Sequence, residues 1–210
     1  MLRGLGGIIN DSPFVRNTSI TPGQSYRGDV RDWGVSGELN YDLGGAKLTS
    51  ITAYRDWRWL RGQDADFNNL DILNREDDGS ANQKFETFTQ EVRLQGNAFD
   101  DKLDWLVGGY FANEVLTLND NLAYGADYTR YADALTRLSS PTFPGYAVVG
   151  ALLSPTAPLT LQGVRVNDSY EQTSRNWALF THNTLSLSDK LSLTVGLRYT
   201  NEKKTLDASF

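Results

Sequence analysis

The chain has 210 residues, a formal net charge of −6, no cysteine and 1 histidine. The acidic balance argues against nucleic-acid binding, which uses a basic patch, and the lack of cysteine excludes disulfides, cysteine-based zinc sites and a thiol nucleophile. No apolar run approaches the ~20 residues of a membrane-spanning helix, so a soluble β protein and a membrane β-barrel remain, because both alternate apolar and polar residues.

The first 32 residues carry no clear strand pattern, and we expect residues 1–32 to be a loop or partial strand region. Glycines at positions 4, 6 and 7 interrupt the apolar residues at the N-terminus. A secretory signal needs an apolar core of roughly 7–15 residues, so we expect none here. Either the protein is cytoplasmic, or the start of a longer parent protein is missing.

Period-two alternation predicts the first two strands. Between Trp33 and Leu43 every second residue is apolar or glycine, and the residues between them are polar or glycine. Residues 42–45 form a glycine turn into a second strand at about 47–59. Leu48 and Ile51 fall on opposite faces of that strand, and a β-bulge would bring them onto the same face.

The middle of the chain predicts two more strands between two long loops. The strands are 85–96 and 103–113, joined by a short turn. The polar, acidic segment 61–84 is expected to be one long loop. The second, 114–172, contains Pro141, Pro144, Pro155 and Pro158, and a short helix is expected at 128–138.

The last two predicted strands, 174–187 and 190–204, form a hairpin, and residues 205–210 are expected to begin a truncated loop. On the second of them Leu191, Leu193, Val195, Leu197 and Tyr199 share one face. Thr194 and Arg198 lie on the other face. We expect the first set to meet lipid and the second to meet the lumen of a barrel.

Strand length and loop spacing decide the fold class. The six predicted strands have 11 to 15 residues, against about 5–6 in most globular proteins and about 9–11 for a barrel strand that crosses a bilayer. Short turns alternate with long loops, as in outer-membrane barrels. The sequence therefore predicts an all-β, antiparallel transmembrane β-barrel segment over 33–204, and a soluble β-sandwich is the alternative.

Aromatic residues test that interpretation, because barrels place aromatic girdles at both membrane interfaces. Two aromatic levels are visible if the long loops share one side. Near the short turns lie Tyr41, Phe99 and Trp105. Near the long loops we expect these membrane-interface aromatics: Trp33, Trp57, Trp59, Tyr110, Phe111, Trp177 and Tyr199.

Five segments resemble, in order, barrel strands of TonB-dependent receptors. They are LTSITAYR at 48–55, FTQEVRL at 88–94, LDWLVGGYF at 103–111, NWALF at 176–180 and LSLTVGLRYTNE at 191–202. The resemblance covers about 33–204. Barrels of such transporters have 22 strands, whereas six are predicted here, so the resemblance implies an incomplete barrel.

The resemblance also implies a function. Members of this family lie in the outer membrane of Gram-negative bacteria, contact its lipid, and take up a scarce small-molecule or metal-chelate ligand, such as a ferric siderophore, cobalamin or a saccharide. The TonB protein supplies the energy through a plug domain and a short box that we do not find in these residues. A passive outer-membrane channel or other barrel, and a soluble β-sandwich binding module, are the alternatives.

Candidate chemistry is sparse, and we expect neither an enzyme nor a bound cofactor. Asp64, Asp66 and Asn68 begin like a calcium loop, but Asn69 and Arg75 stand where that loop needs glycine and glutamate. His182 has no partner motif. We therefore predict no metal site and no catalytic site, and the ligand-binding residues are unknown at this point.

Overall fold

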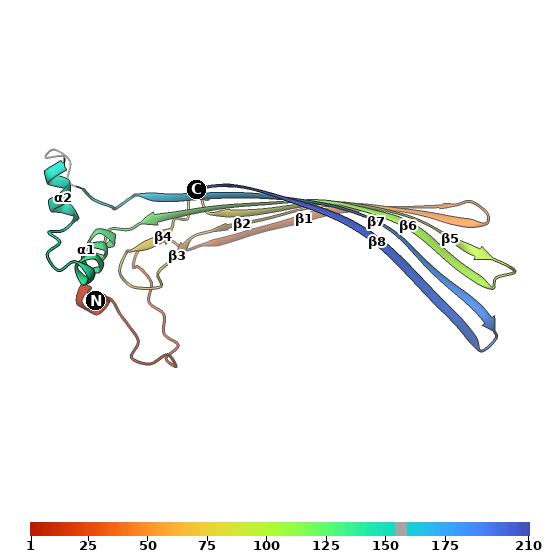
Figure 1. Cartoon of the computed structure of the whole chain (residues 1–210), viewed down its shortest axis with the longest axis horizontal. Coiled ribbons are helices and arrows are strands. Elements are labelled where there is room, and N and C mark those ends of the chain that lie inside the picture. The colour runs from red at the N-terminus through yellow and green to blue at the C-terminus, as the bar shows by residue number, and fades with distance from the viewer. Residues whose placement is uncertain (154–158) are drawn as a thin grey trace.

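One antiparallel sheet dominates the computed structural model, which describes residues 1–153 and 159–210 (Figure 1). Its long strands lie side by side in chain order. They are β1 (Gly28–Asp42), β2 (Ala46–Arg61), β5 (Asn82–Ala98), β6 (Leu103–Tyr124), β7 (Arg165–Ser188) and β8 (Leu191–Ser209). Two short strands, β3 (Gln63–Asp64) and β4 (Leu73–Arg75), belong to the connection between β2 and β5, and β4 pairs with β6 beyond the end of β5.

The sheet is open. In the described residues β1 pairs only with β2, and β8 pairs only with β7. All six predicted strands are confirmed, in a single sheet rather than in the two sheets of a sandwich. The fold is therefore that of an incomplete antiparallel barrel. No helix in the described residues is long and apolar enough to cross a membrane.

The strands extend further than the sequence pattern predicts. Residues 114–124 continue β6 and residues 165–173 continue β7, so the loop expected at 114–172 is wrong and the connection spans 125–164. Residues 205–209 continue β8 and are not the start of a loop. Residues 165–173 are largely polar and carry no clear alternation, while the backbone ladder continues. Residues 114–124 do alternate, with Leu116, Leu118 and Leu122 on one face, so the prediction simply ended that strand too early.

The bulge suggested for the second strand is also wrong. The pairing of β2 with β1 and with β5 runs without a shift through Leu48 and Ile51. Ile51 therefore lies on the opposite face from Leu48, between Glu38 and Glu91 of the neighbouring strands. A bulge was suggested because Ile51, as an apolar residue, was expected on the same face as Leu48.

In the described residues the helices lie at the end of the molecule that carries the long connections (Figure 1). The predicted short helix is confirmed as α1 (Tyr128–Ser139), and Tyr128 stacks on Tyr124 at the end of β6 with ring centroids 3.8 Å apart. A second helix, α2 (Tyr146–Leu153), follows it, and a 3₁₀ turn, η1 (Leu2–Leu5), opens the chain. Pro155 and Pro158 lie outside the described residues.

The opposite end of the sheet holds the three short turns (Figure 1). Gly44 turns β1 into β2 with φ 87°, and its amide donates to the Asp42 carboxylate at 2.7 Å. A positive φ is the conformation that glycine adopts at little cost. The β5–β6 turn instead holds Phe99, Asp100 and Asp101 at φ values of 57°, 53° and 61°. All long connections therefore leave from one end of the strands.

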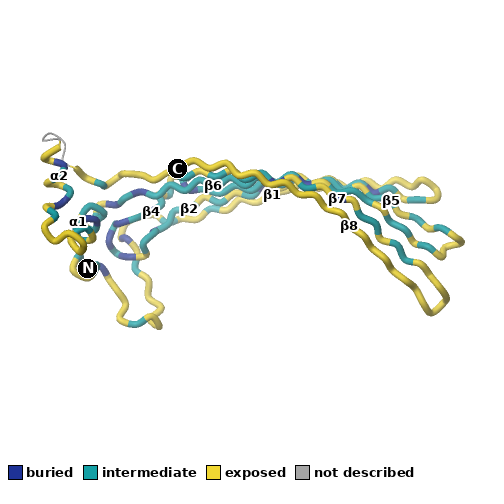
Figure 2. Tube along the Cα trace, viewed as in Figure 1, coloured by how far each residue is buried: buried dark blue, intermediate teal, exposed yellow. Residues whose placement is uncertain are grey.

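The large buried apolar side chains lie in the long connections, whereas the buried residues of the long strands are small or polar (Figure 2). Leu70, Ile72 and Asp64 in the β2–β5 connection are 6%, 4% and 3% exposed. Large apolar side chains on the strands stay exposed, for example Leu197 at 69%, Val35 at 64% and Leu39 at 61%. No second layer covers either face in the described structure, so water is a poor solvent for this sheet.

We predict that the isolated chain will not form a stable soluble monomer. Two open edges and an exposed apolar face favour aggregation or a requirement for detergent. Size-exclusion chromatography and thermal unfolding in detergent-free buffer measure this. A monodisperse monomer with a cooperative transition would contradict the barrel interpretation.

Candidate functional site: the two faces of the sheet

Strand register assigns every side chain to one of two faces, because directly paired residues in antiparallel strands point to the same side. One row crosses all six long strands through Tyr41, Leu48, Leu94, Val107, Thr181 and Leu197. The row offset by one residue passes through Asn40, Thr49, Arg93, Gly108, Phe180 and Arg198. We call the first face the outer face and the second the inner face.

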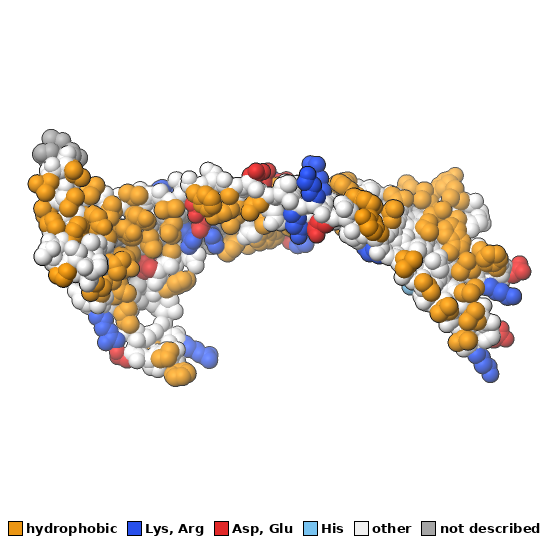
Figure 3. Space-filling model, viewed as in Figure 1, with side chains coloured by type: hydrophobic (Ala, Val, Ile, Leu, Met, Phe, Trp, Pro, Cys, Tyr) orange, Lys and Arg blue, Asp and Glu red, His pale blue; other side chains and the backbone are white. Residues whose placement is uncertain are grey.

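The outer face carries an apolar band toward the short turns. It contains, among others, Val35, Leu39, Val92, Leu179, Leu193 and Val195. In the space-filling view apolar side chains gather over this part of the strands, and charged side chains lie at the turn tips and around the middle of the molecule (Figure 3). The band therefore has a polar boundary on each side.

Three aromatic pairs mark the boundary on the side of the long connections. Trp33 and Tyr54 have ring centroids 5.5 Å apart, Phe88 and Phe111 6.4 Å, and Trp177 and Tyr199 5.5 Å. Each pair joins two adjacent strands on the outer face. We call these six residues the aromatic belt. Tyr41 and Trp105 lie on the same face toward the turns, which gives the second aromatic level.

Charged residues begin directly beyond the belt on β2 and β5. The Tyr54 hydroxyl donates to the Glu86 carboxylate at 2.8 Å, so its ring lies in the belt and its polar tip beyond it. Asp56 is only 2% exposed and pairs with Arg58 at 2.8 Å and Lys84 at 3.8 Å. Lys84 also contacts Glu86 at 2.7 Å. An aromatic row followed by a charged row is typical of a bilayer interface.

The register divides the seven aromatics predicted for the membrane interface. Four are on the outer face: Trp33, Phe111, Trp177 and Tyr199. The other three, Trp57, Trp59 and Tyr110, are on the inner face. The sequence left the register of the second strand open, so it did not assign Trp57 and Trp59 to a face. Sequence reasoning omitted Tyr54, whose parity follows from its pairing with Val35.

The inner face is polar and carries charged residues at its centre. Glu91 and Arg93 form an ion pair at 3.5 Å. The Arg198 guanidinium lies over the rings of Tyr110 and Phe180, at 5.7 Å and 5.5 Å from their centroids. Such cation–π contacts orient an exposed guanidinium over the ring faces without an ion pair. The expected assignment of Thr194 and Arg198 to the face opposite Val195 agrees with the register.

Gly108 makes the aromatic contact on the inner face possible. A Cβ at this position would lie 2.4 Å from Cζ of Phe180, its direct partner on β7. That separation is far below van der Waals contact, and the atom it meets belongs to a ring that also carries Arg198. A side chain at position 108 would therefore displace the ring and loosen the stacked arginine.

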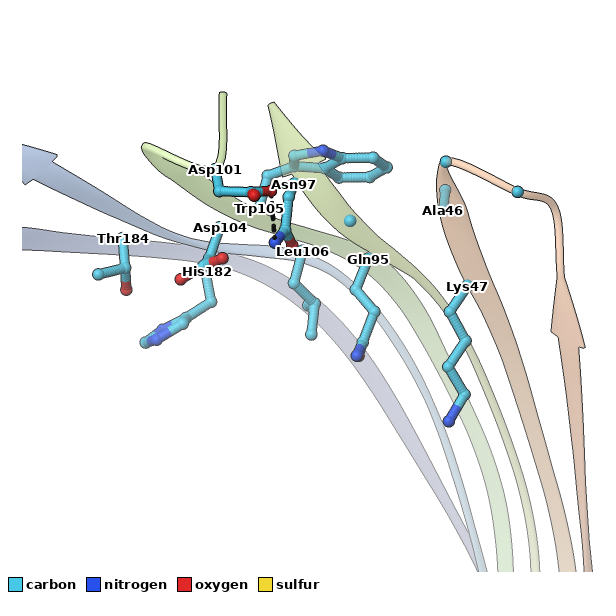
Figure 4. A pocket seen from close by; sticks show the side chains of 13 residues that line it. Ala46, Lys47, Gln95, Asn97, Asp101, Asp104, Trp105, Leu106, His182 and Thr184 are labelled. Carbon is cyan, nitrogen blue, oxygen red and sulfur yellow. Dashed lines mark hydrogen bonds between the residues drawn. The ribbon is translucent and has the colours of Figure 1, made fainter. Parts of the chain in front are cut away.

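A polar hollow of about 670 Å³ lies near the short turns (Figure 4). Lys47, Gln95, Leu106 and His182 point to the same side of the sheet there, and Trp105 points to the other. His182 faces Gly196 across the β7–β8 ladder. The single histidine is thus an inner-face residue. The described part of the chain shows no group of three or more potential metal ligands around it or elsewhere.

The carboxylates that resemble a calcium loop bind backbone amides instead. Asp64 accepts hydrogen bonds from the amides of Thr21 and Phe67 at 2.8 Å and 2.7 Å. Asp66 accepts from the amides of Leu73 and Asn68 at 2.7 Å and 3.1 Å, and burial raises the pKa of its carboxyl. These side chains therefore shape the β2–β5 connection.

Arg75 ties the same connection to the sheet. Its guanidinium donates to both oxygens of Asp120 on β6, at 2.5 Å and 2.7 Å, and Arg61 lies 3.4 Å from the same carboxylate. Arg75 is 17% exposed and Asp120 27%. A bidentate, half-buried pair of this kind fixes the position of a loop better than an exposed ion pair does.

The single curved sheet, with its apolar band, aromatic belt and polar inner face, defines part of a transmembrane β-barrel. A family model for the TonB dependent receptor-like beta-barrel matches residues 3–209. The chain belongs to this family, which is a receptor and transporter family and not a class of enzymes.

One solved structure supports the fold. The chain is similar to the crystal structure of the ferric yersiniabactin uptake receptor FyuA from Yersinia pestis, with 17% sequence identity and a TM-score of 0.55. The likeness covers 90% of this chain and 23% of that chain, so the chain spans about a quarter of the length of the receptor it matches. No curated protein matches the chain.

We predict that Val195→Arg will destabilise the complete receptor far more than Thr194→Arg. An arginine on the lipid face near the bilayer midplane costs about 2–4 kcal/mol, whereas the inner face hydrates it. The two residues are adjacent, so the backbone context is matched. Reversible folding into lipid vesicles gives the comparison, and equal costs would mean that the faces are assigned wrongly.

We also predict that Arg75→Gln will loosen the β2–β5 connection, because it removes a charge-assisted pair worth about 1–3 kcal/mol. Limited proteolysis of the folded receptor should then cut within 62–81 faster than in the wild type. Arg27→Gln is the control, because Arg27 is 70% exposed and lies 3.6 Å from Asp77. Equal sensitivity of the two variants would show that the Asp120 contact does not hold the connection.

Proposed function

We propose that this chain forms part of the barrel of an outer-membrane receptor that imports a scarce ligand by TonB-dependent active transport. The observation that supports it most is the two-faced sheet, whose apolar outer band ends at an aromatic belt. Membership of the receptor family supports the same proposal. The location that follows is the outer membrane of a Gram-negative bacterium, with membrane lipid against the outer face.

The proposed orientation places the short turns in the periplasm and the long connections outside the cell. Outer-membrane barrels have short periplasmic turns and longer extracellular loops. In this chain all long connections leave one end of the sheet, where the strands also continue beyond the aromatic belt. The extracellular interface of the membrane would then hold Trp33, Phe111, Trp177 and Tyr199, together with Tyr54 and Phe88.

The polar inner face fits a lumen that holds a plug domain. TonB would contact the receptor through that plug and its box, and not through these residues. The ligand we favour is a ferric siderophore, because FyuA, which takes up ferric yersiniabactin, shares the fold. Cobalamin and saccharides are the other ligand classes of such receptors, and the connections that would contact them are 62–81 and 125–164.

Uptake measurements test this function. Cells that carry the complete receptor should accumulate a labelled ferric siderophore only when TonB is present. A receptor in which 125–164 is replaced by a short Gly-Ser turn should still fold but should lose ligand binding, because that connection lies at the proposed extracellular mouth. Uptake that persists without TonB would instead indicate a passive channel.

Protease treatment of intact cells tests the orientation. We predict cleavage within 62–81 or 125–164 and none at the β7–β8 turn near Asp189, because only the former would face the medium. Cells with a permeabilised outer membrane provide the control, in which the turn also becomes accessible. Cleavage at the turn alone in intact cells would reverse the topology.

A further inference from the structure

A small polar hollow interrupts the outer face just beyond the aromatic belt on β7 and β8. It has a volume of about 200 Å³ and is lined by Thr173, Arg175, Lys203 and Thr205. These residues form two directly paired rows, Thr173 with Thr205 and Arg175 with Lys203. All four therefore point to the same side as Trp177 and Tyr199.

The two cations of the hollow are placed against each other without a counter-charge. Directly paired residues have Cβ atoms about 4.5–5.5 Å apart, and like charges at this distance destabilise a sheet. Within the described residues neither Arg175 nor Lys203 lies within 4.0 Å of a carboxylate. Arg175 instead donates to the Asn113 side chain at 3.0 Å, which orients its guanidinium on the outer face.

Two cations further along the outer face, on β2 and β5, show the opposite arrangement. There Arg58 and Lys84 are neutralised by Asp56 and Glu86 at distances of 2.7–3.8 Å. Arg58 and Lys84 are thus paired with carboxylates within the chain, whereas Arg175 and Lys203 contact hydroxyl and amide groups. The nearest outer-face carboxylates on their strands, Glu171 and Asp207, lie beyond the two threonines. This contrast points to an anion that comes from outside the chain.

The position of the hollow identifies the source of that anion. Arg175 stands two residues beyond Trp177, which is roughly 7 Å along a strand. Interface aromatics lie at the level of the lipid headgroups, so two residues further out the outer face meets headgroup phosphates. Basic pockets on membrane proteins bind such phosphates. A soluble anion would be expected on the lumen side or in the loops rather than on the lipid side.

Resting on the function proposed above, we propose that Arg175 and Lys203, with the hydroxyls of Thr173 and Thr205, bind the phosphate of a lipid in the outer leaflet. The guanidinium and ammonium groups neutralise the phosphate, and the two threonine hydroxyls donate to its remaining oxygens. Asn113 positions Arg175 for this contact. The acyl chains of the same lipid would lie along the apolar band below the belt.

Native mass spectrometry of the complete receptor in non-ionic detergent tests the site. The probe is a hexa-acylated lipid A with two phosphates, and inorganic phosphate is the competitor. Lys203→Gln should weaken lipid binding about fivefold, and Arg175→Gln with Lys203→Gln roughly thirtyfold, since each basic residue near a charged lipid surface contributes a factor of about five. Lys204→Gln is the matched control, because this substitution removes the same charge at the next residue. Lys204 lies on the inner face, where it pairs with Glu202.

The possible outcomes distinguish a failure of the proposed lipid site from a failure of the proposed barrel function. Loss of lipid with Lys203→Gln but not with Lys204→Gln supports the site. Equal loss in both, or loss in neither, overturns it, and so does full displacement by inorganic phosphate at an affinity equal to that of the lipid. Folding of the wild type into zwitterionic phosphocholine vesicles is measured separately. Failure of that folding would overturn the barrel function as well, whereas successful folding without lipid A selectivity overturns only the site.

Discussion

A single antiparallel sheet with no second layer must find a different environment for each of its two faces. In a sandwich or an α/β fold, a packed layer covers the apolar face and completes the core. Here, in the described residues, the outer face presents residues such as Leu197 and Val35 with nothing packed on them. In the proposed receptor barrel, lipid would satisfy that face, and a water-filled or plugged lumen would satisfy the other. The remaining features of the molecule follow from this division.

Charged residues on the outer face occur at positions that would lie outside the hydrocarbon region of a bilayer, and apolar residues at positions that would lie within it. The band between the two aromatic levels is mostly apolar, whereas beyond the belt Asp56, Arg58, Lys84 and Glu86 form a connected group. Asp56 is buried by its own partners rather than by a core. Ion pairs of this kind cost little at a hydrated interface and a great deal at the centre of a bilayer. The transition therefore locates the boundary of the hydrocarbon region on the strands.

The sequence was sufficient for the fold class because the lipid-facing parts of the strands alternate almost without exception. Trp33 to Tyr41 on β1 and Leu191 to Tyr199 on β8 are the best examples, and in each the alternating apolar residues share one face in the register. Prediction failed where the environment changes. Residues 165–173 are largely polar and are held by backbone pairing, so their side chains carry little period-two signal. Residues 114–124 do alternate, through Leu116, Leu118 and Leu122, and were assigned to the loop although the pattern continues.

The candidate sites were harder to predict because they depend on register between strands. The parity of Trp57 and Trp59 on β2 follows only from their pairing with Phe85 and Gln83 on β5, which no local pattern reveals. The hollow between Arg175 and Lys203 likewise requires that positions 28 residues apart stand opposite each other. Helix α2 was missed for a different reason, since its eight residues are almost all apolar and lack helical periodicity.

The two outermost strands impose the last constraint. Each of β1 and β8 has one side of its backbone without a partner in the described sheet. In hydrocarbon each unsatisfied N–H or C=O group costs several kcal/mol, so the edges cannot face lipid. Strands of other chain segments must therefore pair with β1 and β8 before the apolar band can enter a bilayer. Val195 and its neighbours acquire their lipid contact only in that closed barrel, because the edge strand that carries them needs a partner on its open side first.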